Sequence, residues 1–262
     1  MPESKGHLNP GSPMVELSRF DVAPALANVV RHVWIARWHL PPGAVDPQRV
    51  LTSPTFNLVV TDGTAALYGP EPKVQVRALT GSGWAFGLLL RPAAGVLLSS
   101  VAPVDLVGRS CPVSDAPMRE IESALGAEVD ARIVDRLLSR WLCETATRVD
   151  DRGRLVNHVC RLAEEDDSIL RVADLARRAQ LSTRSLERLV VGHVGLPPKW
   201  LIECRRLQHA ATTLYARPED DLTELALTLG YTDYAHFSRR YKAVIGETPN
   251  QTRTLGRARQ RE

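Results

Sequence analysis

Polar and apolar residues follow two different periods along the chain, and strand-like patterns dominate its first part. Residues 73–77 alternate between polar and apolar side chains, the period of two that is typical of a half-buried β-strand. Residues 56–60 and 64–68 are two apolar runs on either side of an Asp-Gly pair at 62–63, a strong hairpin signal. Residues 84–90 form a continuous apolar run of strand length. These patterns predict a compact β-barrel or sandwich.

The period changes to that of a helix after residue 112. Apolar residues then recur at steps of three and four, as in Ile133, Leu137 and Trp141, with charged residues on the opposite face. Val156, Val159 and Ala163 continue the pattern. We expect helices here, followed by a loop and domain boundary at the acidic residues 164–167.

The last third of the chain contains an internal repeat. The helical spacing of Val172, Leu175, Ala176 and Ala179 returns 50 residues later as Leu222, Leu225, Ala226 and Leu229. Beyond the next turn the offset is 51, which aligns Arg188 with Arg239 and two Gly-x-x-Pro segments, 195–198 and 246–249. One inserted turn residue accounts for the change of offset.

Each repeat predicts a helix-turn-helix unit, a layout whose second helix enters the DNA major groove. The expected helix pairs are 172–180 with 183–192, and 222–229 with 234–245. Residues 197–215 predict one connecting helix of about 27 Å. Successive major grooves on one face of B-DNA lie about 34 Å apart, so such a connector can place two helices in adjacent grooves.

The outward faces of the two second helices carry the candidate reading residues. Arginine can form two hydrogen bonds with a guanine edge, and arginine recurs at the matched positions 188 and 239. The alternative is that these are solvated surface charges. On the connector, Arg205 and Arg206 would neutralise phosphates or lie in solvent. The candidate DNA-binding residues are Arg184, Glu187, Arg188, Tyr234, Ala235, His236, Ser238, Arg239, Lys242 and Arg205.

Residues 168–254 resemble the DNA-binding domain of the AraC/XylS family of transcription regulators. The resemblance is carried by the final motifs of that domain: Leu222-Thr-Glu-Leu-Ala226, Gly230-Tyr231, Phe237-Ser238-Arg239, Tyr241-Lys242, Gly246-Glu-Thr-Pro249 and Arg253. The resemblance implies a sequence-specific regulator, more often an activator, that binds double-stranded DNA and RNA polymerase and is controlled by an N-terminal sensor domain. Ala235 departs from the family, because relatives often carry a polar side chain there.

The fold class expected from these patterns is α+β. The expected domains are a flexible tail (1–13), a β-rich regulatory or effector-binding domain (14–112), a helical linker or dimerisation segment (113–165), an AraC-type DNA-binding domain (166–255) and a basic tail (256–262).

The role of the N-terminal domain stays open between three hypotheses. It senses a small-molecule effector; or it is a binding or enzymatic domain that the DNA module localises; or it only forms a homodimer. Trp34, Trp38, Trp84 and Phe86 are weak candidates to line a ligand pocket, with core packing as the alternative. His32 and His39 lack the clustering of a metal site, and no catalytic motif appears, so we expect no metal, no cofactor and no enzyme.

Charge and composition support this interpretation modestly. The 262 residues carry a net charge of +3, but residues 166–262 hold 16 basic and 12 acidic residues, so the positive excess lies in the repeat region. No apolar run is long enough to span a membrane, and no signal peptide is evident, so we expect a cytoplasmic protein. The four cysteines form no C-x-x-C pair, which favours buried thiols over a redox motif.

Overall fold

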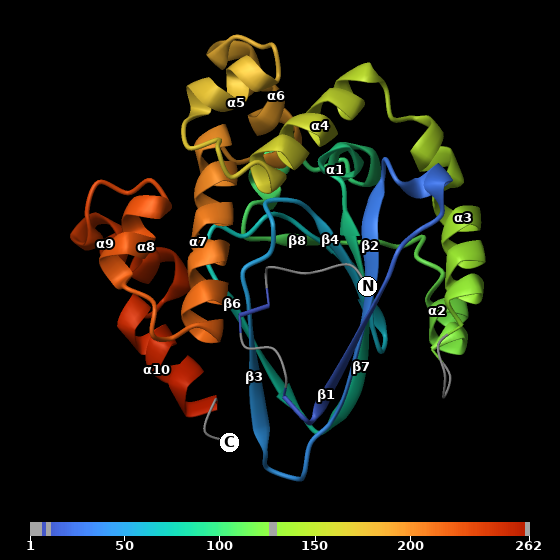
Figure 1. The fold of residues 1–262 in the computed structure, drawn as a ribbon. Coiled ribbons are helices and arrows are strands. Elements are labelled where there is room, and N and C mark those ends of the chain that lie inside the picture. Colours follow the sequence, from blue (N-terminus) through green and yellow to red (C-terminus); the bar gives the residue numbers. More distant parts are fainter. Residues whose placement is uncertain (1–6, 9–11, 126–129, 260–262) are drawn as a thin grey trace.

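The computed structural model describes residues 7–8, 12–125 and 130–259. Its N-terminal part contains two antiparallel sheets that face each other, as Figure 1 shows. The larger sheet has the strand order β1-β2-β7-β4-β5-β8, and the smaller one pairs β3 with β6. The strands are β1 (Val15–Phe20), β2 (Val30–His39), β3 (Val45–Val50), β4 (Asn57–Thr61), β5 (Thr64–Tyr68), β6 (Gln75–Thr80), β7 (Ser82–Leu90) and β8 (Ser110–Pro112).

The hairpin expected at Asp62-Gly63 is confirmed. These two residues join β4 to β5, Thr61 pairs with Thr64, and Gly63 has φ of +74°, the left-handed conformation that such a turn favours. The α+β prediction is confirmed as well, although the two sheets stay separate and do not close into a barrel.

Helices cover the outer face and the top of the larger sheet (Figure 1). They are α1 (Pro92–Leu98), α2 (Met118–Ala124), α3 (Ala131–Thr147) and α4 (Asp151–Glu165), with short 3-10 helices η1 (Pro24–Leu26) and η2 (Pro103–Leu106). Helix α4 is attached to the N-terminal part: Asn157 accepts a hydrogen bond from Ala93 N at 3.0 Å and donates one to Asn28 O at 2.9 Å.

The C-terminal helices follow the predicted repeat closely. They are α5 (Val172–Arg178), α6 (Thr183–Val194), α7 (Pro198–Ala216), α8 (Leu222–Thr228), α9 (Tyr234–Ile245) and α10 (Pro249–Arg259). In Figure 1 the long helix α7 separates the α5–α6 pair from the α8–α9 pair. At 1.5 Å per residue, α7 is about 28 Å long.

The two helix-turn-helix units share their turn chemistry. Gln180 and Gly230 occupy the matched turn positions, with φ of +55° and +76°. The next residue donates to an equivalent carbonyl in each unit: Leu181 N to Ala176 O at 2.9 Å, and Tyr231 N to Ala226 O at 3.0 Å. The second unit then holds one additional turn residue before its second helix.

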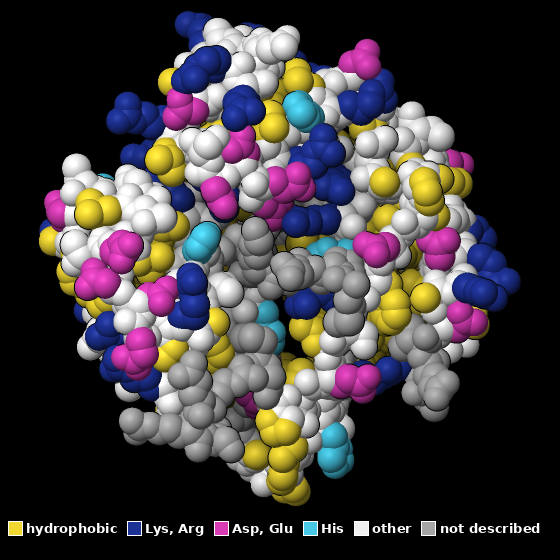
Figure 2. Space-filling model, viewed as in Figure 1, with side chains coloured by type: hydrophobic (Ala, Val, Ile, Leu, Met, Phe, Trp, Pro, Cys, Tyr) yellow, Lys and Arg dark blue, Asp and Glu magenta, His cyan; other side chains and the backbone are white. Residues whose placement is uncertain are grey.

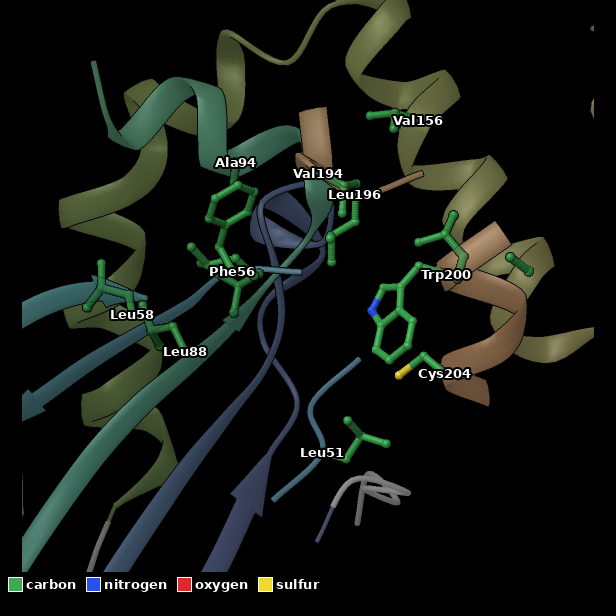
Figure 3. Close-up of a cluster of buried hydrophobic side chains, with 14 of the residues drawn as sticks. Leu51, Phe56, Leu58, Leu88, Ala94, Val156, Val194, Leu196, Trp200 and Cys204 are labelled. Carbon is green, nitrogen blue, oxygen red and sulfur yellow. The ribbon is translucent and has the colours of Figure 1, made fainter. Parts of the chain in front are cut away.

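One hydrophobic core runs through both parts of the chain. Figure 3 shows Leu51 of the N-terminal part and Val156 of α4 in the same cluster as Trp200 and Cys204 of α7. All four side chains are buried, and Trp200, the most exposed of them, is 7% exposed. The N-terminal part and the helix between the two helix-turn-helix units are therefore packed as one body.

The chain ends differ from the sequence prediction. A flexible tail over 1–13 is wrong at Leu8, which is buried and donates from its N–H to Arg49 O at 2.9 Å. Residues 1–6 and 9–11 lie outside the described part of the chain. The expected basic tail begins as helix, because α10 continues to Arg259; residues 260–262 are also outside the described part. None of the helices among the described residues combines the length and apolar character that crossing a membrane requires.

Gln180 should limit stability, because a side chain in the left-handed region carries a steric cost that glycine avoids. We expect Gln180→Gly to raise the free energy of unfolding by about 0.5–1 kcal/mol, measured by urea denaturation. Gly230→Ala at the matched turn is the control and should lower it, since the new Cβ would also lie 3.1 Å from Leu170. A loss of stability in Gln180→Gly would contradict the assigned turn conformation.

Candidate nucleic-acid interface and ligand cavity

The second helix of each unit begins at a side-chain cap. Ser182 Oγ accepts from Ser185 N at 3.1 Å at the start of α6, and Asp233 Oδ1 accepts from His236 N at 2.7 Å at the start of α9. These bonds satisfy N–H groups that have no partner within the helix. The caps therefore fix where each second helix starts, and with it which residues lie on its outward face.

The inward faces of α6 and α9 are buried as the spacing predicts. Leu186 and Val190 of α6 are fully buried, as are Phe237 and Tyr241 of α9. The phenol of Tyr241 also hydrogen-bonds Thr252 Oγ1 at 2.8 Å, which ties α9 to α10. Because the inward face is fixed in this way, the opposite face of each helix is held toward solvent.

The outward faces present the basic residues that the repeat aligned. Arg184, Glu187 and Arg188 are exposed on α6, and Arg239 is exposed on α9. Within the described part of the chain, the three arginine side chains among them form no hydrogen bond or ion pair. Their guanidinium groups therefore have all donors available for a phosphate or a base edge. Ala235 and Lys242 share the exposed face of α9.

Three other candidates on α9 are half-buried, and two of them have partners within the protein. His236 Nδ1 lies 3.1 Å from Thr232 Oγ1, and the Tyr234 ring packs against Phe237 with 6.3 Å between centroids. Ser238 is half-buried beside them. Their assignment to DNA binding stays a prediction.

Arg205 does not lie on the surface, so its expected phosphate contact is wrong. Its side chain is only 4% exposed. Nη1 donates to Ala163 O at 2.9 Å and also to Asp166 O, while Nη2 donates to Ile169 O at 2.6 Å. Nε lies 3.6 Å from an Asp167 carboxylate oxygen. The end of a helix leaves carbonyls without intrahelical donors, and this guanidinium satisfies them where α4 ends and α5 approaches.

The neighbouring α7 residues also serve the protein interior. The guanidinium of Arg206 lies over the Tyr231 ring, 3.9 Å from its centroid, a cation–π contact between α7 and the second turn. Glu203 accepts two hydrogen bonds from Arg240 of α9, at 2.6 and 2.8 Å. Neighbouring residues of α7 therefore bond the segment that leads into the first unit and the second unit itself.

The C-terminal end of each second helix contacts the N-terminal part. At the end of α6, Gly195 has φ of +79°, and a Cβ there would fall 2.4 Å from Pro103 O. At the end of α9, Val74 N donates to Val244 O at 2.9 Å, and Arg49 Nη2 donates to Ile245 O at 2.9 Å. The N-terminal part therefore contacts the second helix of both units.

A cavity of about 360 Å³ lies between the two sheets. Figure 2 shows a hollow near the centre of this face, with hydrophobic, basic and histidine side chains around it. The volume falls in the range of about 300–1,000 Å³ that is usual for ligand sites. The wall is contributed mainly by alternate residues of β1–β6, including Leu17, Arg19, His32, Trp34, Trp38, Gln48, Val50, Asn57, Tyr68, Glu71, Gln75 and Arg77, with Arg31 and Glu164 at one end.

The four aromatic candidates lie on two different faces of the larger sheet, because side chains alternate between the faces along a strand. Trp34 and Trp38 line the cavity. Trp84 and Phe86 are not part of its wall; Phe86 is 1% exposed in the core, and Trp84 packs against that core. Trp84 and Phe86 therefore serve core packing, which was the alternative to a role in ligand binding. Sequence reasoning missed Arg19, His32 and Gln48 as wall residues, because only strand pairing decides which face of a strand turns inward.

The cavity wall contains an ion pair and titratable groups whose pKa values are shifted by burial. Arg31 forms an ion pair with Glu164, and Ser53 Oγ donates to the same carboxylate at 2.6 Å. Burial raises the pKa of Glu71, which the Arg77 guanidinium opposes. Burial also lowers the pKa of His32 to about 4, so this ring is neutral at physiological pH.

The cysteines and histidines form no metal centre in the part of the chain that the structure describes. Cys204 is buried and its thiol donates to Thr52 O at 3.5 Å, and burial raises the pKa of Cys160 and Cys204. Cys143 is exposed on α3, which differs from the interpretation of all four as buried thiols.

Comparison with known proteins agrees with the two-part organisation. A family described as a helix-turn-helix domain matches residues 175–254, and a domain of unknown function, DUF6597, matches residues 18–112. The activator RhaS of Yersinia pestis (strain Pestoides F) is 28% identical over 45% of this chain and 43% of its own. The XylDLEGF operon activator of Pseudomonas putida is 31% identical over 38% and 30%. The activator NphR of Rhodococcus sp. is 24% identical over 78% and 53%.

Among solved structures, an AraC-type regulator of Chromobacterium violaceum aligns with 39% of this chain and 92% of its own, at 27% identity and a TM-score of 0.36. ToxT of Vibrio cholerae aligns with 92% and 96%, at 10% identity and a TM-score of 0.44. The chain spans less than two thirds of the length of the curated relatives.

The paired units with caps, left-handed turns and outward arginines define a two-unit helix-turn-helix protein. Together with the matched domain and the curated relatives, these features make residues 175–254 a helix-turn-helix domain of the AraC/XylS type.

Arg188 and Arg239 should carry sequence discrimination. We expect Arg188→Ala and Arg239→Ala each to weaken binding to a selected site by about 1–3 kcal/mol, because a lost bidentate base contact costs that much, while binding to random DNA changes less. Fluorescence anisotropy at fixed salt measures both. Arg136→Ala on α3 is the control for loss of an exposed positive charge. Equal losses on specific and random DNA would mean that these arginines contact only phosphates.

Arg205 should act on stability rather than on DNA. Arg205→Ala should lower the free energy of unfolding by about 2–4 kcal/mol, because it leaves buried carbonyls without charged donors. Arg205→Lys keeps the positive charge but loses the forked donors of the guanidinium, so its free energy of unfolding should lie between those of Arg205→Ala and the unmodified protein. The salt dependence of DNA affinity should keep its slope in Arg205→Lys. If the slope of log affinity against log salt concentration became shallower by about one while stability stayed unchanged, Arg205 would contact a phosphate after all.

Proposed function

We propose that this chain is a DNA-binding transcription regulator whose α6 and α9 read two adjacent major grooves under the control of the N-terminal β-rich part. The observation that carries the proposal is the equivalence of the two units. Each has a left-handed turn residue, a capped second helix and, at the matched position, an outward arginine with no partner among the described residues. These are the features that base recognition in the major groove requires.

The length of α7 supports reading two grooves from one chain. Its length of about 28 Å is close to the roughly 34 Å between major grooves on one face of B-DNA. The bonds from Arg240 to Glu203 hold the second unit against this helix, and the bonds from Arg205 attach the helix to the segment that leads into α5. A rigid connector lets both helices engage without a further ordering cost.

Strand β3 supports control by the N-terminal part. Its alternate residues Gln48 and Val50 line the cavity, and Arg49 between them reaches the end of α9. Arg49 Nη1 also pairs with Glu247 at 2.9 Å. The following residue, Leu51, accepts a hydrogen bond from Gln208 of α7 at 2.7 Å. A ligand that moves β3 therefore acts directly on α7 and α9.

The further partners follow from the family. We expect an effector molecule in the cavity, RNA polymerase as the partner of an activator, a homodimer in solution, and action in the cytoplasm, where the DNA lies. Sedimentation of the full chain tests the dimer, and transcription from a selected site tests activation.

Site selection from random DNA tests the two-groove proposal. We expect recovered sites to contain two short elements whose centres lie about 10–10.5 base pairs apart, one helical turn. Arg188→Ala should relax the sequence of one element and Arg239→Ala that of the other. Recovery of a single element, or both variants relaxing the same one, would overturn the proposal.

Arg49 should help to fix the spacing between the reading helices. Arg49→Ala removes the bonds to Ile245 and Glu247, so α9 should tilt more freely relative to α6. We expect the affinity ratio between the selected site and a site lengthened by one base pair to fall at least threefold, as measured by competition binding. Arg177→Ala on α5, an exposed arginine paired only within its helix, is the control. An unchanged ratio in Arg49→Ala would show that α7 alone sets the spacing.

A further inference from the structure

The cavity wall combines flat aromatic surfaces with hydrogen-bond donors that have no partner among the described residues. The combination of aromatic faces and these donors indicates which class of molecule the cavity accepts. The inference drawn from it rests on the proposed sensor function and makes that function more specific.

The aromatic surfaces are the rings of Trp34 and Trp38. In the β2–β7 register Trp34 pairs with Gly87 and Trp38 with Gly83. A Cβ on Gly87 would fall 1.9 Å from Trp34 Cε2, and a Cβ on Gly83 would fall 2.5 Å from Trp38 Cζ2. Each indole therefore lies directly over a glycine of β7. One ring face rests on the sheet, and the other is directed into the cavity.

Trp34 is also fixed in orientation. Its Nε1 donates to Asn57 Oδ1 at 3.0 Å, which satisfies the polar edge of the ring. A satisfied and immobilised indole offers only its π-face, and π-faces stack well against planar apolar groups. This part of the wall therefore favours a flat apolar ligand body.

Arg19 supplies a positive charge beside these rings. It pairs directly opposite Trp34 in the β1–β2 register, so both side chains share the cavity face of the sheet. Within the described residues its guanidinium forms no hydrogen bond or ion pair. The other cationic wall residues have partners: Arg31 pairs with Glu164, and Arg77 lies over the Tyr68 ring at 5.3 Å. Arg19 therefore leaves one positive charge uncompensated in the wall.

Two buried polar side chains add donors without acceptors. Gln48 is 7% exposed; its Oε1 accepts from His7 Nε2 at 2.8 Å, whereas its buried Nε2 has no partner in the part of the chain that the structure describes. His32 is 4% exposed, and its ring nitrogens make no hydrogen bond among the described residues. A buried donor without an acceptor costs roughly 1–3 kcal/mol, a cost that a bound acceptor group removes.

We propose that the cavity binds a small carboxylic acid with a flat, apolar body, whose carboxylate is neutralised by Arg19 and accepts hydrogen bonds from the Gln48 and His32 side of the wall. A carboxylate has one negative charge and acceptor sites only, which matches one uncompensated guanidinium and neighbouring donors. A polyhydroxylated neutral molecule would leave the two indole faces without an apolar partner. A doubly charged phosphate would exceed the charge that Arg19 supplies.

Isothermal titration calorimetry on the full chain tests the ligand class. The probes are trans-cinnamate and biphenyl-4-carboxylate, each compared with its uncharged carboxamide of nearly the same shape. We expect one molecule bound per chain, and at least tenfold tighter binding of one acid than of its amide. Equal binding of acid and amide, or no binding of either acid at millimolar concentration, would overturn the proposal.

Variants locate the binding within the cavity. Arg19→Gln should weaken the acid at least tenfold and leave the amide within about twofold, so that the preference disappears; Arg136→Gln on α3 is the charge control. Gln48→Leu should weaken the acid several-fold, and Trp38→Leu should weaken acid and amide alike. Binding of the amide shows that the cavity of a variant is intact, so a variant that loses both ligands is misfolded. If Arg19→Gln is misfolded, the acid preference of Gln48→Leu tests the assignment instead. An acid preference that persists in both Arg19→Gln and Gln48→Leu would overturn the assignment.

The same titrations separate this inference from the proposed function. An uncharged ligand that binds in the cavity and changes DNA affinity would refute the carboxylate and keep the sensor. An acid that binds as expected and leaves DNA affinity unchanged would keep the ligand class and refute control of DNA binding.

Discussion

The structure depends most on a single strand that is shared between the cavity and the reading helices. In β3, Gln48 and Val50 turn inward to the cavity, while Arg49 between them bonds the C-terminal end of α9. The alternation of side chains along a strand makes this arrangement unavoidable once the register is fixed. A displacement on one face of β3 therefore appears on the other face, and the segment just after it is also bonded to α7 through Gln208.

This shared strand explains why the two parts of the chain pack as one body. Leu51 follows β3 and lies in the same core as Trp200 of α7, and Arg205 closes the end of α4 against α5. Both reading helices end against the N-terminal part, α6 at Pro103 and α9 at Arg49 and Val74. Their mutual position is thus set from three sides: by α7 between them and by a contact at each end.

The sequence predicted the local features of the fold well, because these depend on periodicity and turn chemistry. The helix-turn-helix units and the Asp-Gly hairpin lie where the patterns placed them, and the span of α9 was predicted to the residue. Turn geometry also accounts for the change of offset in the repeat, since Gln180 and Gly230 match at 50 residues and the caps Ser182 and Asp233 at 51.

What the sequence could not predict depends on contacts between distant residues. Arg205 has the spacing of a partly exposed helical residue, yet the end of α4, about 40 residues earlier, needs its donors, and no local signal encodes that. Trp34 and Trp84 are similar as residues, and only the β2–β7 register directs one into the cavity and leaves the other in the packing. The guanidinium of Arg19 and the Nε2 of Gln48 gain their importance because neither has a partner among the described residues, which is visible only in the assembled wall.

Hydrogen exchange of the full chain with and without its selected DNA tests the role of β3 most directly. If β3 links the cavity to the reading helices, DNA bound at α6 and α9 must alter β3, because coupling between two sites is reciprocal. We predict slower amide exchange in α6 and α9 and a changed rate in residues 48–53. Protection of the two helices with unchanged exchange across 48–53 would contradict the account.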